Sequence, residues 1–272
     1  MRSVERVTKV NIITISRLLV SAGKAAVAYH DEHVKNVNSQ RIQCDEIWAF
    51  CYAKERTVAR AKAAPSEAGD IWTWTALDAD SKLIVAWQMG GRDTEVGQTF
   101  ADDLYGRLAN RVQLTTDGFG AYRGVMEETF GGDVDYAQLV KLYGKASTEE
   151  QRRYSPAQCI GTRKHIMSGS PNMADVSTSY VERHNLTMRM SMRRFTRLTN
   201  AFSKKVENHY YALALYFLHY NFCRVHKTLK TTPAVAAGII DQVYDMDWIV
   251  GLIEKMEGPP KKRGSYKKRI SK

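Results

Sequence analysis

Three carboxylates in this sequence, Asp45, Asp117 and Glu182, have the type and the surroundings of divalent-metal ligands. Hard cations such as Mg²⁺ prefer oxygen ligands, which Asp and Glu supply. Two such ions about 3.5 to 4 Å apart can activate the attacking and the leaving oxygen of a phosphodiester. Because the chain contains 29 Asp and Glu residues, spacing alone would select many triples. The elements around each carboxylate must therefore decide which ones form a site.

Asp45 lies in the run RIQCDEIWAF, residues 41–50, which is typical of a central strand covered on both faces. A charge buried there needs a metal ion or a partner. Glu46 is the next residue and points to the opposite face of the strand, so we expect only one of the two to face a given site. We choose Asp45.

Asp117 and Glu182 lie at the ends of predicted elements. Asp117 closes the predicted strand RVQLTT, at an edge where open sheets present ligand-binding residues. Glu182 begins a long basic helix. Two alternatives stay open: Asp117 as an Asx-turn residue before Gly118, and Glu182 as a first-turn carboxylate stabilised by the helix dipole.

The elements that position these residues predict an α/β protein. We expect antiparallel strands over 41–50, 70–80 and 81–90, a helix from an Asp93 cap to about Leu108, a strand ending at Asp117, a helix over 121–129 and a strand over 135–142. Residues 143–177 are interpreted as a loop or insertion. Helices are expected over 178–198 and 204–222, and a short helix follows Thr232-Pro233. This order is that of a ribonuclease-H-like mixed sheet flanked by helices.

The amino-terminal residues 1–20 predict two short helices with a break near Thr8 to Asn11. This pattern resembles a helix-turn-helix, and a plain helical hairpin is the alternative. The expected organisation is therefore a partial helix-turn-helix-like segment (1–36), a catalytic domain (37–225), carboxy-terminal helices (226–256) and a basic disordered tail (257–272).

Positive charge is concentrated in two segments. The formal net charge is +11, and residues 261–272 alone hold seven Lys and Arg without an acid. From Arg183 to Lys205 cations again occur without acids, and they alternate with a stripe of Met188, Met192, Phe195, Thr199 and Phe202 that fits one helical face. A face of one sign favours an anion such as the DNA backbone. The expected DNA-binding residues are Arg183, Asn185, Arg189, Arg193, Arg194, Arg197, Lys204, Lys205, Lys261, Lys262, Arg263, Lys267, Lys268 and Arg269. For the tail, a solubilising role is the alternative.

The composition excludes several protein classes. With 44% hydrophobic and 25% charged residues, the chain can bury a core, so wholesale disorder is excluded. The longest apolar run, residues 210–218, is shorter than the roughly 20 residues of a membrane span. No secretory signal is recognisable, and four single cysteines offer no zinc pattern. We expect a cytoplasmic protein.

Several strings resemble the transposases of the insertion-sequence-one family, a branch of the DDE transposases: CDEIW, TTDGFGAY, the stretch from Ser177 to Gly238, and within it HYNFCRVHKTLKTTPAVAAG. The resemblance covers most of residues 1 to 250. It implies a ribonuclease-H-like core with catalytic Asp, Asp and Glu at Asp45, Asp117 and Glu182. It also implies magnesium as cofactor, for which manganese substitutes, and binding of terminal inverted repeats through the amino-terminal helices. Family members often carry a zinc finger and a full helix-turn-helix ahead of this region, and this chain starts inside the second of these.

The expected function is that of a DNA transposase that cleaves the ends of an insertion sequence and transfers the 3′ ends to target DNA. Synapsis of two ends implies a homodimer or higher oligomer on double-stranded DNA. His184 either helps to position the site or simply packs. Two alternatives remain: a catalytically inactive or truncated DNA-binding remnant that regulates a full-length transposase, and a related nuclease without strand transfer.

Overall fold

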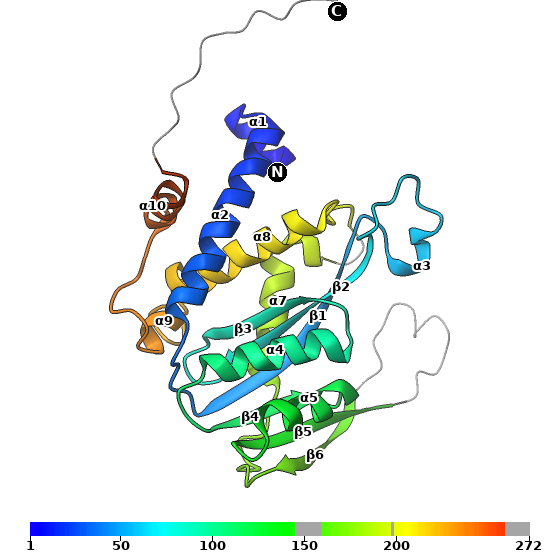
Figure 1. Ribbon diagram of the computed structural model, residues 1–272, viewed down its shortest axis with the longest axis vertical. Coiled ribbons are helices and arrows are strands. Elements are labelled where there is room, and N and C mark those ends of the chain that lie inside the picture. The colour runs from blue at the N-terminus through cyan, green and yellow to red at the C-terminus, as the bar shows by residue number, and fades with distance from the viewer. Residues whose placement is uncertain (145–158, 197–198, 259–272) are drawn as a thin grey trace, which may run out of the picture.

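The structure is a computed structural model that describes residues 1–144, 159–196 and 199–258 (Figure 1). Its helices and strands are, in chain order, α1 (Arg2–Thr8), α2 (Ile12–His33), β1 (Arg41–Cys51), α3 (Glu55–Val58), β2 (Gly69–Asp78), β3 (Ile84–Gly90), α4 (Thr94–Arg107), β4 (Val112–Asp117), α5 (Gly120–Phe130), β5 (Val134–Tyr143), β6 (Cys159–Ser168), α7 (Ser179–Ser191), α8 (Val206–Leu218), α9 (Pro233–Ala236) and α10 (Met246–Glu257).

The strands form one mixed sheet in the order β3-β2-β1-β4-β5-β6. The first three strands along the chain are antiparallel neighbours, β4 lies parallel to β1 and β5 parallel to β4, and β6 returns antiparallel at the edge. Helices α4 and α5 make the two crossovers between parallel strands. The predicted order from the first strand through the fifth is therefore confirmed, and β1 is central.

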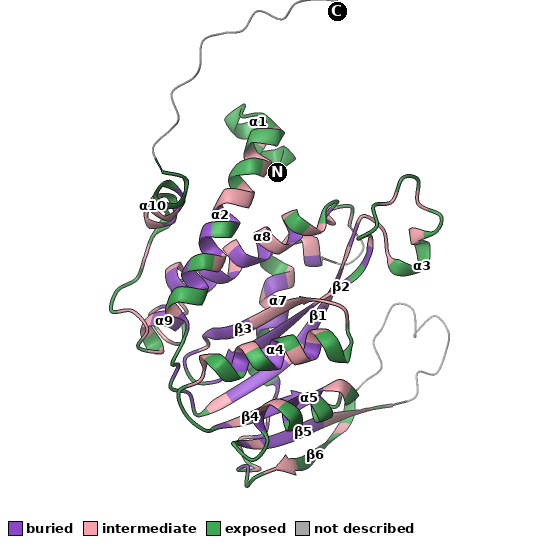
Figure 2. Ribbon diagram, viewed as in Figure 1, coloured by how far each residue is buried: buried purple, intermediate pink, exposed green. Residues whose placement is uncertain are grey.

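The two faces of β1 pack against different helices, because successive side chains alternate across a strand. Ile42 and Cys44 belong to the large core with Trp74 of β2 and with residues of α4 and α5 such as Phe100. Ile47, on the opposite face of β1, belongs to a second cluster formed with α7 and α8. The central strands are buried throughout much of their length (Figure 2). Asp45 thus lies on the α7 side and Glu46 on the α4 and α5 side.

The amino-terminal helices contain the predicted break, and the second helix is longer than expected. Lys9 adopts a left-handed conformation after α1, and the Asn11 side chain accepts a hydrogen bond from the Ile13 N–H to start α2. α2 then continues to His33. At Gly23 an added Cβ would lie 2.2 Å from the Cβ of Tyr211, so the absence of a side chain allows α2 and α8 to approach closely.

One described helix, α2, is long and apolar enough to cross a membrane, judged by length and composition alone. In this structure its second half packs on α8 and α10, with Ala22 and Ala25 in contact with Ile253. The sequence prediction considered only uninterrupted apolar runs. It therefore did not consider α2, in which Arg17 and Lys24 interrupt the apolar residues.

Two predictions about residues 143–198 are wrong. The segment interpreted as a loop contains the edge strand β6. The helix expected to reach residue 198 ends at Ser191, and Met192 is extended before a single 3₁₀ turn over Arg193–Phe195. The apolar spacing is preserved because Met188 and Phe195 both reach the cluster under α7 and α8 without a continuous helix.

Candidate metal and DNA site

Asp45, Asp117 and Glu182 line one pocket of about 440 Å³. They come from the middle of β1, the end of β4 and the first turn of α7. The pairing of β1 with β4 ends at Cys44 and Thr116, so Asp45 and Asp117 are the first residues beyond the last pair. The parting of these two strands leaves room for a site, and the structure brings the three predicted carboxylates to it.

Hydrogen bonds hold the first two carboxylates in place. Asp45 accepts from the Glu46 N–H at 2.9 Å and from the Asn185 side-chain amide at 2.8 Å. Asp117 accepts from the Phe119 N–H at 2.9 Å, the Asx-turn contact that its sequence context allowed. The turn role and a place in the pocket are therefore compatible for Asp117.

Glu182 is positioned by contacts from three elements. Its carboxylate forms an ion pair with Lys141 of β5 and accepts from the Thr178 hydroxyl. The start of α7 is anchored to β1, because the Gln43 side-chain carbonyl accepts the N–H groups of Tyr180 and Val181 at 2.9 and 3.1 Å. Lys141 and Gln43 were not identified from the sequence, where nothing links them to Glu182.

Glu46 approaches the site from the other face. One oxygen from each of Asp45, Glu46 and Asp117 lies within 4.8 Å of the other two. The expectation that only one of the two adjacent acids faces the site is therefore wrong, because both carboxylates reach it. β1 has no β4 partner beside Glu46, so the longer Glu46 side chain can extend past the strand. Among the described residues, this close group does not include Glu182.

The Glu46 side chain is 1% exposed and is bound by two residues. Arg92 donates to it from Nε at 2.6 Å, and the Tyr122 hydroxyl donates at 2.9 Å. The Arg92 guanidinium lies over the rings of Phe119 and Trp72, at 4.0 and 4.7 Å from their centres, and lines the pocket with the carboxylates. Arg92 is thus a fixed cation of the site. Sequence reasoning missed it, because its contact with Glu46 depends on the strand register.

Burial and mutual repulsion make ionisation of the acids unfavourable. Burial, and then the charges of Glu46 and Asp117, raise the pKa of Asp45 to about 7. Burial also raises the pKa of Glu46 and of Asp117, although Arg92 opposes both shifts. Burial alone would lower the pKa of Lys141, but its bond to Glu182 outweighs this and raises it.

The donor set fits a divalent cation. Four carboxylates, including that of Glu46, gather around the pocket with two cations, Arg92 and Lys141, so two negative charges lack compensation among these residues. All the acidic donors are hard oxygens, the ligands that Mg²⁺ and Mn²⁺ prefer. A bound divalent ion would supply the missing charge and remove the repulsion that raises the pKa of Asp45.

The predicted DNA-binding residues divide into exposed and inward-facing groups. Arg183, Arg193, Lys204 and Lys205 are exposed. Arg189 is partly buried, and Arg194 is also partly buried, where it donates to the Ser203 hydroxyl at 2.6 Å. Asn185 is buried against Asp45 rather than exposed on the outer face. Arg197 and the six predicted tail residues, Lys261, Lys262, Arg263, Lys267, Lys268 and Arg269, lie outside the described residues.

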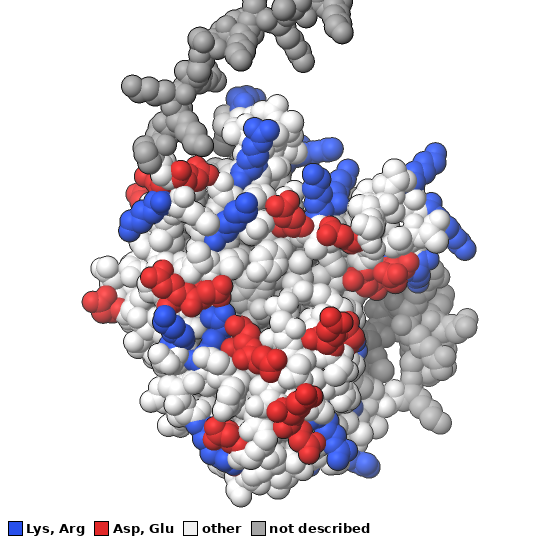
Figure 3. Space-filling model, viewed as in Figure 1, with Lys and Arg blue, Asp and Glu red and all other residues white. Residues whose placement is uncertain are grey.

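Charge is unevenly distributed over the described surface. Acidic side chains gather over α4, whereas Lys and Arg gather over α1, the start of α2 and the arm that carries α3 (Figure 3). Helix α4 contributes Glu95, Asp102 and Asp103. An anionic polymer would therefore be repelled at α4 and attracted at the basic end.

His184 is a packing residue in this structure. It is buried among Phe217, Tyr216 and Tyr220, with its ring centre 4.6 Å from that of Tyr220. Burial, with the charges of His226 and Arg224, lowers its pKa to about 3. It stays neutral at physiological pH.

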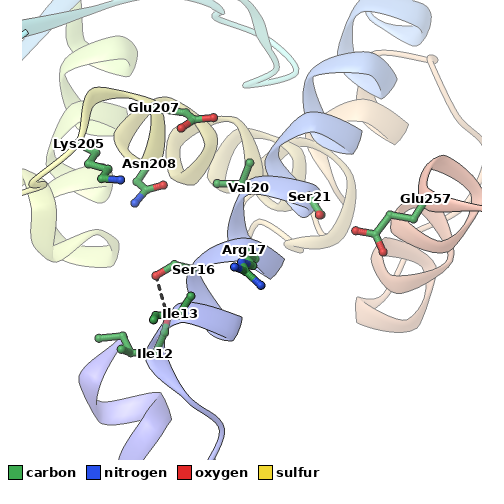
Figure 4. Close-up of a pocket in the computed structure, with 10 residues that line it drawn as sticks. All are labelled: Ile12, Ile13, Ser16, Arg17, Val20, Ser21, Lys205, Glu207, Asn208 and Glu257. Carbon is green, nitrogen blue, oxygen red and sulfur yellow. Dashed lines mark hydrogen bonds between the residues drawn. The ribbon is translucent and has the colours of Figure 1, made fainter. Parts of the chain in front are cut away.

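A separate hollow of about 800 Å³ lies between α2, the start of α8 and the end of α10 (Figure 4). Arg17 and Lys205 line it together with Glu207 and Glu257, and it shares no lining residue with the carboxylate pocket. It has two acidic and two basic lining residues rather than a cluster of carboxylates, so it offers no counterpart to the metal-ligand set.

Comparison with protein families and with curated protein sequences finds no match to this chain. Two solved structures show some likeness. A cryo-EM structure of the piggyBac transposase synaptic complex with hairpin DNA has a TM-score of 0.33 and 13% identity, over 83% of this chain and 55% of that one. A crystal structure of the Mos1 strand transfer complex has a TM-score of 0.25 and 11% identity, over 75% and 58%. The chain thus spans a little over half the length of either protein. At these TM-scores the likeness carries no argument about function, which has to be inferred from the pocket itself.

Proposed function

We propose that this chain is a DNA transposase of the insertion-sequence-one type, which cleaves DNA at the ends of an element and joins the 3′ ends to target DNA. The observation that carries the proposal is the convergence of Asp45, Asp117 and Glu182 on one pocket from three elements. The three residues are far apart in the sequence, so they meet in one pocket only because the fold brings them together. The family resemblance of the surrounding strings is the second support.

We also propose a ribonuclease-H-like class for the sheet. The support is the strand order, in which three antiparallel strands are followed by two parallel strands on the other side of β1. In this arrangement the first strand and the fourth strand deliver Asp45 and Asp117 to the same place.

In the proposed site, Asp45, Asp117 and Glu182 would hold the metal, with Mg²⁺ as the physiological ion. Such an ion activates water or a 3′ hydroxyl and stabilises the leaving oxygen of a phosphodiester. Asn185 orients Asp45 through its hydrogen bond, and Lys141 positions Glu182 at the pocket wall through their ion pair. Arg92 binds the phosphate, because its guanidinium is fixed by Glu46 and two rings.

DNA would lie across the exposed cations Arg183, Arg193, Lys204 and Lys205, away from the acidic surface of α4. Helices α1 and α2 would contribute to recognition of the terminal repeats, and two chains would hold the two ends. The tail beyond residue 258 would add non-specific affinity that falls as salt rises. We place this activity in the cytoplasm.

Incubation of the protein with Mg²⁺ and DNA that carries the ends flanking its gene tests the proposal. Nicked and joined products are expected, and Asp117→Asn should abolish both while DNA affinity stays within a few fold. Asp103→Asn, a partly exposed acid on α4 that does not line the pocket, is the matched control and should be fully active. Cleavage without joining would favour the nuclease alternative. Binding without cleavage would favour the inactive remnant.

A further inference from the structure

A row of partly exposed aromatic side chains leads away from the carboxylate pocket. It consists of Trp72, Trp48, Phe50 and Phe202, which we call the aromatic stripe. It begins at Arg92, whose guanidinium lies over the Phe119 ring inside the pocket and over the Trp72 ring outside it. The pocket and the aromatic stripe are therefore one continuous surface.

Strand register and ring contacts connect the four residues. Trp72 and Trp48 are register partners on the same face of β2 and β1. The ring centre of Phe50 lies 5.7 Å from that of Trp48, and Phe202 lies 4.9 Å from Phe50. Lys54 places its ammonium 5.6 Å from the Trp48 ring and 5.9 Å from the Phe50 ring.

The rings are partly exposed because the strands continue past the helices that cover Trp74. Trp74, on the same sheet face, is fully buried beneath α4 and α5, against Phe100 and Tyr122. Beyond it, β1 and β2 extend toward the arm that carries α3 (Figure 1). Trp72 and Trp48 lie on this part of the strands and are partly exposed.

The far end of the aromatic stripe meets the basic segment. The Tyr52 N–H donates to the Ser203 carbonyl at 2.7 Å, which fixes Phe202 beside Phe50. The exposed Lys204 follows directly along the chain. Two acids border the row, Glu55 and Asp70, and each carboxylate accepts the backbone N–H of the other.

We propose that the aromatic stripe binds the unpaired bases of a single DNA strand that passes through the pocket. The inference rests on the proposed function and adds the form of DNA that the site accepts. Every base has a π face, so rings with interspersed cations bind single strands with little sequence preference. In a duplex the base faces are stacked on one another, so only an unpaired strand can use these four rings.

Binding of labelled oligonucleotides without a divalent metal tests this directly, since cleavage cannot intervene. The probes are a blunt duplex, the same duplex with a thymidine overhang, and the same duplex with an abasic overhang that keeps the phosphates. We expect the thymidine overhang to raise affinity about tenfold over the blunt duplex. The abasic overhang should raise it by less than about threefold, because only phosphate contacts remain.

Trp48→Ala should remove most of the thymidine advantage and leave blunt-duplex affinity within twofold, whereas Trp48→Phe should retain most of it. Tyr105→Ala is the matched control, because Tyr105 is 45% exposed on α4, outside the aromatic stripe. A readout without substitution uses 5-iodouracil in the overhang. Irradiation should crosslink it to the peptide that contains Trp48 and Phe50.

Equal affinity for blunt and overhanging duplexes would overturn the inference while leaving the proposed function intact. The same holds if Trp48→Ala weakens all probes equally, or if it changes the molar mass in solution, since a second copy would then be the occupant. Absence of binding to every probe would overturn both proposals.

Discussion

Gln43 ties the strand of Asp45 to the helix of Glu182, and its replacement provides a sharp test of the site. The residue is buried in β1, two positions before Asp45. Its carbonyl oxygen accepts the first free N–H groups of α7, a function that no side chain at the N-cap position performs. Gln43→Met keeps the shape of the side chain and removes the acceptor.

The structure gives the size of the effect. The N–H of Val181 is buried with its residue, and leaving it unpaired costs about 1–3 kcal/mol. The N–H of Tyr180 lies in a residue that is 43% exposed, so water replaces most of its bond, and loss of a cap of this kind costs about 1 kcal/mol. We expect the free energy of unfolding to fall by about 2–3 kcal/mol. Because Glu182 comes directly after Val181, a shift of about 1 Å in α7 should slow cleavage by about 100-fold.

Urea unfolding and Mg²⁺-dependent DNA cleavage, measured on the same preparations, check these values. The control is Gln113→Met, because Gln113 also accepts one backbone N–H, that of Asn172 at 2.8 Å, but from a β4 position outside the pocket. It should lose less than about 1.5 kcal/mol and cleave at the wild-type rate. Full activity of Gln43→Met, or an equal loss in Gln113→Met, would refute the reasoning.

Three further substitutions probe other parts of the molecule. Tyr122→Phe removes one hydrogen bond to the Glu46 carboxylate and should lower the free energy of unfolding by about 2 kcal/mol. Unchanged urea unfolding would contradict a contribution of this buried hydrogen bond to stability. Asn221→Leu removes the side-chain amide that bonds the N–H and the carbonyl of Ile84, and it should lower the free energy of unfolding in urea by about 3 kcal/mol. A loss below half of this value would refute the role of Asn221 in holding β3. Burial lowers the pKa of His30 to about 3, so the unfolded chain binds the extra proton below pH 6.5 and stability is lost as pH falls. Between pH 6 and pH 4 the wild type should therefore lose about 2 kcal/mol more than His30→Gln, and parallel pH profiles would contradict this.

The sequence predicts the strands in which runs of apolar residues are bounded by turn residues, and it fails where these signals are absent. β1 and β4 were identified because apolar residues and turn residues mark them. β6 was missed because most of its residues are exposed, as at an edge, so its side chains show no alternation. The end of α7 was missed because no Gly or Pro marks it, and because Phe195 packs beside His209 from a 3₁₀ turn as well as it would from a helix.

The same limit applies to the site. Asp45, Asp117 and Glu182 could be chosen from their elements, because each lies at a recognisable strand or helix position. Arg92 and Lys141 could not, because their roles come from pairing with acids distant in the sequence and depend on strand register. The predicted surface role of Asn185 assumed that its helix face is open, whereas that face packs on β1.

Titration of the protein with Mn²⁺ by calorimetry, in wild-type, Glu182→Gln and Asp103→Asn forms, tests the central claim most directly. We expect stoichiometric binding in the wild type and in the Asp103→Asn control, and at least tenfold weaker binding in Glu182→Gln. Binding in Glu182→Gln equal to that of the wild type, or no binding in any form, would contradict the assignment of Asp45, Asp117 and Glu182 as the metal ligands.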